Sequence, residues 1–134
     1  MTHTLQIRVY YEDTDLAGIV YYANYLKFIE RGRSEWVRAL GLDQAAMKAA
    51  GAGVFAVRRV EADYLAPAHF DDLLDVTTAH IRHSGARLVL AQQVLRAGQL
   101  LFDARVTLVC LGDTGRPQPL PRQLTAHLPQ NTPT

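Results

Sequence analysis

The second half of the chain alternates apolar and polar positions over long stretches, and this alternation restricts the fold more than any other feature. From Phe102 to Cys110 every second residue is apolar, which is the pattern of a strand buried on one face. Three further strand-like segments precede it and are joined by short turn sequences: residues 54–65, 73–82 and 87–95. The alternation in the first of them changes phase near Arg58 and Arg59, which predicts a β-bulge. The chain after Gly53 is therefore predicted to form four long antiparallel strands.

The first half of the chain contains one long amphipathic helix. Apolar residues recur at helical spacing between about Tyr22 and Leu40, and they are Leu26, Ile29, Trp36, Val37 and Leu40, with Phe28 beside the stripe. Gly32 interrupts this helix, and close packing against a sheet would explain a glycine there. A first strand is predicted over residues 5–11 and a short second helix, capped by Asp43, over residues 44–50. Together these elements predict an α+β domain in which about five antiparallel strands wrap around one central helix.

Length and composition fit a single domain of ordinary character. The chain has 134 residues, of which 49% are hydrophobic and 20% charged, and the formal net charge is +1. This charge gives no reason to expect a nucleic-acid partner, and no apolar run approaches the length of a membrane span. One domain is expected over residues 1–121, followed by a flexible C-terminal tail over residues 122–134. The single cysteine, Cys110, excludes an internal disulfide, and the N-terminus has no signal-peptide pattern, so a cytoplasmic location is expected.

The segment before the long helix carries the candidate chemistry. Glu12, Asp13 and Asp15 form a short acidic loop. Loop acids usually form solvated turns, and that interpretation suits Glu12 and Asp13. Asp15 differs because a turn at Gly18 and then the helix start follow closely, and the first turn of a helix carries unpaired N–H groups that can hold a developing oxyanion. A carboxylate beside such donors can attack a thioester directly or activate water, so the sequence predicts hydrolysis of an activated carbonyl.

The same stretch resembles a known family. Residues 11–36, YEDTDLAGIVYYANYLKFIERGRSEW, look like the signature of hotdog-fold acyl-CoA thioesterases of the 4-hydroxybenzoyl-CoA thioesterase type, and the closest branch is the Tol-Pal-associated, YbgC-type thioesterases. The likeness continues through residues 57–76, VRRVEADYLAPAHFDDLLDV, and into the last strand, so it covers nearly all of the chain to about Pro121. The first motif is long and specific, whereas the later segments carry less weight alone. The resemblance implies a hotdog fold and hydrolysis of acyl-CoA to a free acid and coenzyme A, without a metal or other cofactor.

The resemblance also implies roles for individual residues. Asp15 is implied to be the catalytic carboxylate, and the backbone N–H of Tyr22 is implied to polarise the thioester carbonyl. The branch often has histidine where this chain has Tyr22, so only the backbone role carries over. The implied substrate-binding positions are Glu30 at the acyl pocket, a backbone donor near Val54 from the facing subunit, and Arg82, Ser84 and Arg87 at the nucleotide part of coenzyme A. Simpler interpretations stay open for these positions, since exposed helix acids and solvated hairpin arginines are both common.

The sequence leaves two main functional hypotheses, an enzyme and a non-catalytic binding module. In the first, the protein is an acyl-CoA thioester hydrolase with Asp15 as nucleophile or general base. The alternative is a non-catalytic module that binds acyl-CoA or an acyl-carrier protein and is linked to the cell envelope. A hotdog hydratase would need a histidine at the site, and neither the acidic loop nor the helix start contains one; the five histidines are also scattered without the spacing of a zinc site. The resemblance further implies a homodimer or homotetramer with its sites at the subunit boundary, and an exposed edge strand gives such pairing a physical reason.

Overall fold

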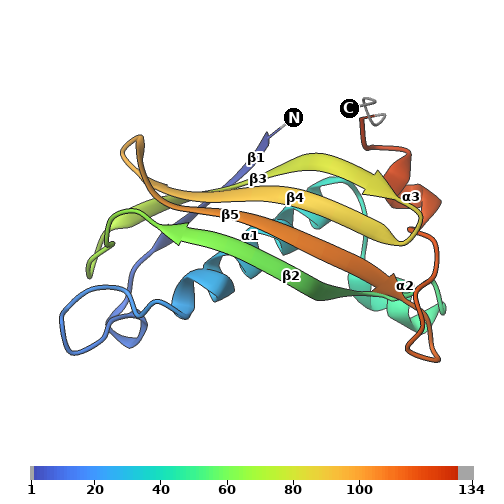
Figure 1. Cartoon of the computed structure of the whole chain (residues 1–134), viewed down its shortest axis with the longest axis horizontal. Coiled ribbons are helices and arrows are strands. Elements are labelled where there is room, and N and C mark those ends of the chain that lie inside the picture. The colour runs from blue at the N-terminus through green and yellow to red at the C-terminus, as the bar shows by residue number, and fades with distance from the viewer. Residues whose placement is uncertain (1, 130–134) are drawn as a thin grey trace.

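The computed structural model describes residues 2–129, which fold into a five-stranded antiparallel sheet with a long helix along one face (Figure 1). The strands in chain order are β1 (Thr2–Arg8), β2 (Val54–Tyr64), β3 (Leu73–Ser84), β4 (Arg87–Arg96) and β5 (Gln99–Leu111). Their order across the sheet is β1-β3-β4-β5-β2, so β1 and β2 are its edge strands. The predicted α+β architecture is confirmed.

Among the described residues, three α-helices accompany the sheet: α1 (Asn24–Ala39), α2 (Gln44–Ala49) and α3 (Arg122–Thr125). The first two lie close to where the sequence predicted them. The Asp43 carboxylate caps α2 by accepting a hydrogen bond from the Ala46 N–H at 3.1 Å, as expected of an N-cap residue. None of the helices within residues 2–129 has the length and apolar character needed to cross a membrane.

Gly32 lets α1 approach the sheet closely. A Cβ atom at this position would lie 2.7 Å from Cγ1 of Val76 and 3.3 Å from Oγ1 of Thr78, both on β3. The glycine in the helical stripe therefore has the packing reason that the sequence suggested. In the same contact, Nε2 of the buried Gln92 on β4 donates a hydrogen bond to the Ile29 carbonyl of α1 at 2.8 Å.

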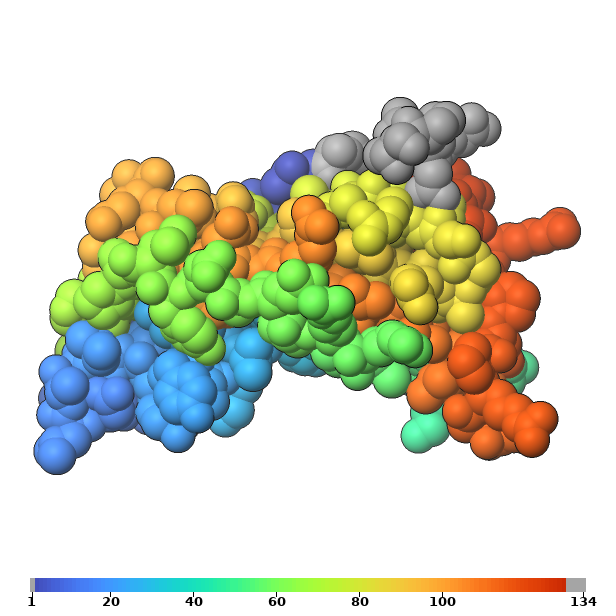
Figure 2. Space-filling view, viewed as in Figure 1, coloured from blue at the N-terminus to red at the C-terminus, as the bar shows by residue number. Residues whose placement is uncertain are grey.

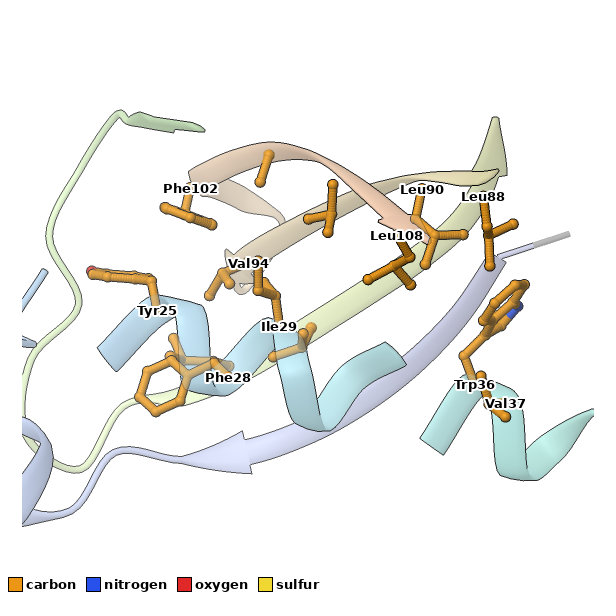
Figure 3. Packing of buried hydrophobic residues seen from close by; sticks show 14 of the residues in the cluster. Tyr25, Phe28, Ile29, Trp36, Val37, Leu88, Leu90, Val94, Phe102 and Leu108 are labelled. Atoms are coloured by element: carbon orange, nitrogen blue, oxygen red, sulfur yellow. The ribbon is translucent and has the colours of Figure 1, made fainter. Parts of the chain in front are cut away.

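The core lies between α1 and the helix-facing side of the sheet (Figure 3). Tyr25 stacks on Phe102 with ring centroids 5.0 Å apart, and Phe28 and Ile29 are almost completely buried. Phe28, which the sequence placed beside the apolar stripe, is thus a central core residue, whereas Leu26 is 41% exposed. The buried face of α1 is rotated from the predicted stripe toward Phe28.

The predicted β-bulge in β2 is confirmed. Val57 pairs with Leu108 and Arg59 pairs with Thr107, so Arg58 is the extra residue in the strand. A bulge bends a strand and changes the direction in which the inserted side chain points.

The end of β1 differs from the prediction. Tyr11, which was expected in the strand, belongs to the short 3₁₀ helix η1 (Tyr11–Asp13). The Asp13 carboxylate accepts a hydrogen bond from the Tyr10 N–H at 2.8 Å and closes this first turn of the acidic loop.

The C-terminal segment also differs from the prediction. Leu120 and Leu124 are buried, and Leu124 lies in α3. The Leu120 N–H donates to the Gly85 carbonyl, and the Gln118 N–H donates to the Cys110 carbonyl, both at 2.9 Å. Leu124 extends the core beyond residue 121, where the domain was expected to end, whereas the expected flexibility of residues 122–134 stays a prediction. Residues 130–134 lie outside the described residues.

Candidate active site

The acidic loop holds the Asp15 carboxylate by local hydrogen bonds. An antiparallel bridge between Thr14 and Val20 closes the loop, and the φ of +80° at Gly18 is a conformation that favours glycine. One carboxylate oxygen of Asp15, Oδ1, accepts a hydrogen bond from the Ala17 N–H at 2.9 Å. The other oxygen, Oδ2, has no hydrogen-bond partner among residues 2–129, so one oxygen orients the carboxylate and the other can meet a substrate.

The start of α1 lies against this loop. The side-chain amide of the buried Asn24 and the N–H of Tyr21 both donate to the Asp13 carbonyl at 2.9 Å. The helix begins at Asn24, so Tyr22 comes just before its first turn rather than within it. The Tyr22 N–H has no acceptor in the described part of the chain. It is a spare donor at the positive end of the helix.

The end of β2 forms the opposite wall. The Tyr64 hydroxyl donates a hydrogen bond to the Tyr22 carbonyl at 3.0 Å, and the Tyr64 ring meets the rings of Tyr22 and Tyr25 edge-on. Burial, together with these two neighbouring tyrosines, raises the pKa of Tyr64, so its hydroxyl remains a donor at neutral pH. Sequence reasoning missed Tyr64 because only the pairing of β2 with β5 brings it beside α1.

These three segments enclose a cleft of about 390 Å³ with a largely apolar and aromatic lining. Asp15 and Tyr22 both line it, so the structure brings the two residues with implied catalytic roles into one site. The remaining lining residues are Ile19, Val20, Tyr21, Tyr25, Tyr64, Leu65, Ala66 and Pro67. A carboxylate and a spare N–H in an apolar cleft are the groups that attack on an activated carbonyl requires.

The loop between β2 and β3, residues 65–72, supports this cleft and is braced by an ion pair. Asp72 Oδ2 lies 2.7 Å from Arg96 Nη1 and accepts a hydrogen bond from the His69 N–H at 2.8 Å. Burial alone would raise the pKa of Asp72, but the His69 N–H and the Arg96 guanidinium outweigh it and lower the pKa. The adjacent Ala68 accepts from the Val20 N–H at 2.8 Å, so the braced loop holds the acidic loop in place. Sequence reasoning missed this support, since its members are distant along the chain.

Glu30 and Val54 lie outside the cleft. Glu30 is exposed on α1, accepts a hydrogen bond from the Ser34 hydroxyl at 3.2 Å and lines a small cavity beside Val57. Val54 is the first residue of β2, at the opposite end of the strand from Tyr64. Within one protomer, the structure therefore brings neither Glu30 nor Val54 into the cleft of Asp15.

The hairpin between β3 and β4 lies at the other end of the molecule from the acidic loop (Figure 1). Ser84 and Arg87 pair at its tip and line a cavity of about 270 Å³. Arg58, the extra residue of the bulge, lines the same cavity, whereas the exposed Arg82 does not. The change of phase near Arg58 marked this position in the sequence but did not reveal that it faces the hairpin.

A larger hollow of about 690 Å³ lies between α2 and the C-terminal segment. The acid that lines it is Asp43, whose carboxylate caps α2. No group of three or more His, Cys, Asp or Glu side chains within residues 2–129 is arranged to hold a metal ion, in this hollow or elsewhere. The carboxylate of the larger hollow is occupied as a helix cap, whereas Asp15 has an oxygen without a partner among the described residues, so the smaller cleft is the stronger candidate for chemistry.

Comparison with known proteins shows which family the chain belongs to. Residues 9–128 match the family model described as the thioesterase-like superfamily. The acyl-CoA thioester hydrolase YbgC of Escherichia coli O6:H1 is 39% identical over 126 residues, which cover 92% of this chain and 93% of that protein. The acyl-CoA thioesterase YbgC of Haemophilus influenzae is 38% identical over 122 residues, which cover 90% of this chain and 89% of that protein.

Solved structures lead to the same family. The crystal structure of a probable thioesterase from Bartonella henselae is 38% identical and matches with a TM-score of 0.86, covering 90% of this chain and 100% of that one. The hotdog fold that the sequence resemblance implied is confirmed by this match. The protein described above is a member of the thioesterase-like superfamily.

Proposed function

We propose that this protein hydrolyses acyl-CoA thioesters to a free carboxylic acid and coenzyme A. The observation that carries the proposal is the cleft shared by Asp15 and Tyr22, in which a carboxylate oxygen and a backbone N–H are both without partners in the described chain. Two YbgC relatives named for this activity support it, each at more than a third identity.

Asp15 promotes attack on the thioester carbonyl carbon by one of two routes. As a nucleophile, its carboxylate displaces the CoA thiolate and forms a mixed anhydride, which water then opens to the acid and the free carboxylate. As a general base, it takes a proton from the water that attacks the carbonyl. On either route the thioester oxygen becomes negative and accepts a hydrogen bond from the Tyr22 N–H, an interaction that typically contributes about 10²–10³ in rate.

The enzyme acts as a homodimer that pairs along β2 and associates further into a tetramer. Figure 2 shows β2, in green, uncovered along the front of the molecule. As an edge strand it offers free backbone groups, and Val54, Val57 and Val60 are all partly exposed on it. Antiparallel pairing about a two-fold axis sets the Val54 end of one copy against the Tyr64 end of the other. This pairing carries the partner's β3–β4 hairpin toward the Asp15 cleft.

Coenzyme A is bound across that boundary. Ser84, Arg87 and Arg58 of one subunit face the phosphates of the nucleotide, since arginine forms strong charge-assisted hydrogen bonds to phosphate, and Arg82 adds charge nearby. A backbone N–H near Val54 of the facing subunit donates a hydrogen bond at the thioester. Glu30 borders the acyl pocket. No cofactor beyond the substrate's own coenzyme A is involved. We also propose that the enzyme is cytoplasmic and is associated with the Tol-Pal envelope system, because the sequence resembles that branch of the family.

Release of free thiol from a panel of acyl-CoA substrates tests the proposal. The Asp15→Asn variant is expected to lose activity by about 10²–10³ or more, because the amide is a poor nucleophile and base. Glu12→Gln, an exposed acid of the same loop, is the matched control and keeps wild-type rates. Binding of acyl-CoA without release of thiol by the wild type would point to the non-catalytic module instead. Single turnover in heavy-oxygen water separates the two routes, because the anhydride route can place the label in the Asp15 carboxylate.

A further inference from the structure

Apolar side chains of α1 and β2 lie between the cleft at Asp15 and the small cavity that Glu30 and Val57 line. Tyr22 and Tyr64 begin this strip, since both also line the cleft. Leu26 follows on α1, one helical turn after Tyr22, and is 41% exposed. Val60 and Val57 follow on the helix-facing side of β2, with 38% and 47% exposure. We call these five residues the apolar strip.

Polar groups end the strip. Glu30, Arg33 and Ser34 come next on the same side of α1 and line a cavity of about 120 Å³ with Phe55 and Val57 of β2. The Arg33 guanidinium is half-buried, and no carboxylate of residues 2–129 lies within ion-pair distance of it. An apolar chain that entered from the cleft would therefore meet a charged group at this point.

The core fixes Arg33 in place. Its Nη1 donates a hydrogen bond to Gln92 Oε1 at 3.4 Å. The Gln92 side chain is fully buried and is itself held, because Nε2 donates to the Ile29 carbonyl at 2.8 Å and to the Thr78 hydroxyl at 2.9 Å. Arg33 is thus held toward the core by partial burial and by this long hydrogen bond to a fixed glutamine.

We infer that the acyl chain of the substrate lies along the apolar strip and that Arg33 limits its length to about eight to ten carbons. This inference rests on the proposed hydrolysis of acyl-CoA. Tyr22 and Glu30 are eight residues apart, six of these steps lie within α1, and the N-cap Ala23 has helical backbone, so the span is about 12 Å. Side chains on a helix lean toward its N-terminus, so the Arg33 guanidinium lies near the level of Glu30. An extended chain advances roughly 1.2 Å per bond, so about ten bonds reach from the thioester carbonyl to this charge.

Continuity with the cleft identifies the acyl chain as the occupant. A thioester carbonyl held at the Tyr22 N–H has the strip directly beside it, because Tyr22 and Tyr64 belong to both. A second copy that pairs along β2 uses the backbone edge of the strand and covers the strip from outside. Longer chains are disfavoured because methylene groups would displace water from a charged guanidinium, which the Glu30 carboxylate stabilises only from beyond ion-pair distance.

The test is the dependence of kcat/KM on chain length, measured by thiol release from straight-chain acyl-CoA substrates of about four to sixteen carbons. The wild type is expected to improve up to about eight to ten carbons and then to fall by about tenfold or more. Arg33→Met removes the charge but keeps an apolar side chain, and it is expected to restore activity on longer chains. Arg33→Lys keeps the charge and the limit. Arg31→Met, an exposed arginine on the opposite side of α1, is the matched control with an unchanged profile.

A second variant makes the test independent of any folding defect at Arg33. Leu26→Trp fills the strip one turn from Tyr22 at a partly exposed position, so it is expected to shorten the limit to about five carbons. A wild-type profile without a break, or a break that neither Arg33→Met nor Leu26→Trp moves, overturns the inference while leaving hydrolysis intact; a strip filled by the second copy gives this result. Absence of thiol release at every chain length overturns the proposed function and the inference with it.

Discussion

Replacing Gly32 with alanine in α1 should change the free energy of unfolding in two opposite ways, through helix propensity and through close packing. Alanine is preferred to glycine inside a helix by about 1 kcal/mol, so propensity alone predicts a more stable protein. The contacts predict the opposite, because the new Cβ would lie 2.7 Å from Cγ1 of Val76 and 3.3 Å from Oγ1 of Thr78. Val76 is completely buried, and its branched side chain has few alternative rotamers, so it does not move aside easily.

The size of the effect follows from these opposing contributions. Extra methyl groups in a well-packed core typically destabilise by about 1–3 kcal/mol, and subtracting about 1 kcal/mol of gained propensity leaves roughly 0–2 kcal/mol. Because the closest contact is with a stiff side chain, we expect the upper half of this range for Gly32→Ala, a loss of about 1–2 kcal/mol. In a domain of this size such a loss lowers Tm by roughly 3–8 °C. Urea unfolding followed by circular dichroism measures it, provided that the m value is unchanged.

A double-mutant cycle identifies the contact responsible. Val76→Ala alone should destabilise by leaving a cavity, but it also removes the atom that the new Cβ would strike. The free-energy loss of the double variant should therefore be smaller than the sum of the two single losses by about 1 kcal/mol or more. If Gly32→Ala proves as stable as the wild type, or if the two effects simply add, the close-packing argument is refuted.

Two further predictions concern the parts that support the site. The pKa of Asp72 is lowered below its ordinary value of 3.8 by the His69 N–H and Arg96, so its contribution to stability is present above that value and is lost as the pH falls through the lowered pKa. Asp72→Asn should therefore cost about 1–2 kcal/mol of unfolding free energy at pH ~7 and progressively less as the pH falls below 3.8, as measured by urea unfolding; a loss that does not depend on pH would contradict the ionic explanation. Arg58→Gln should raise KM for acyl-CoA by about tenfold with little change in kcat, and should leave a short thioester without the nucleotide unaffected. Arg59→Gln, whose side chain pairs with a neighbouring glutamate instead, is the control and should change neither constant.

The sequence predicted features whose causes are local. The Asp43 cap and the β-bulge at Arg58 were both predicted, because a cap needs only a side chain beside its own helix and a bulge shifts the alternation of its own strand. The buried face of α1 was predicted less well. Helical spacing gives the width of an apolar stripe, but the neighbouring sheet decides which edge of the stripe is covered, and it covers Phe28 rather than Leu26.

The candidate site also combines residues that lie close together in the sequence with contacts between distant segments. Asp15 and Tyr22 lie seven positions apart on one loop and helix start, so their meeting in one cleft was predictable from the sequence and its resemblance. Tyr64 reaches the cleft only through the register of β2 against β5, and the loop that braces the cleft depends on a contact between Asp72 and Arg96. No periodicity or spacing signals such contacts, since each joins segments that are separate in the sequence.

The packing of α1 links stability to chemistry. Gly32 sets the distance between the helix and the sheet, and Gln92 bonds to both the helix backbone and Arg33 at that contact. The same helix carries Tyr22 at its start, so a shift of α1 by a few tenths of an ångström moves the carbonyl site and the proposed end of the acyl groove together. Catalytic hydrogen bonds depend on preorganised distances, and a rigid helix transmits a displacement along its length. Substitutions in the interior at Gly32 should therefore change the dependence of activity on chain length as well as stability, even though no atom of Gly32 faces the cleft.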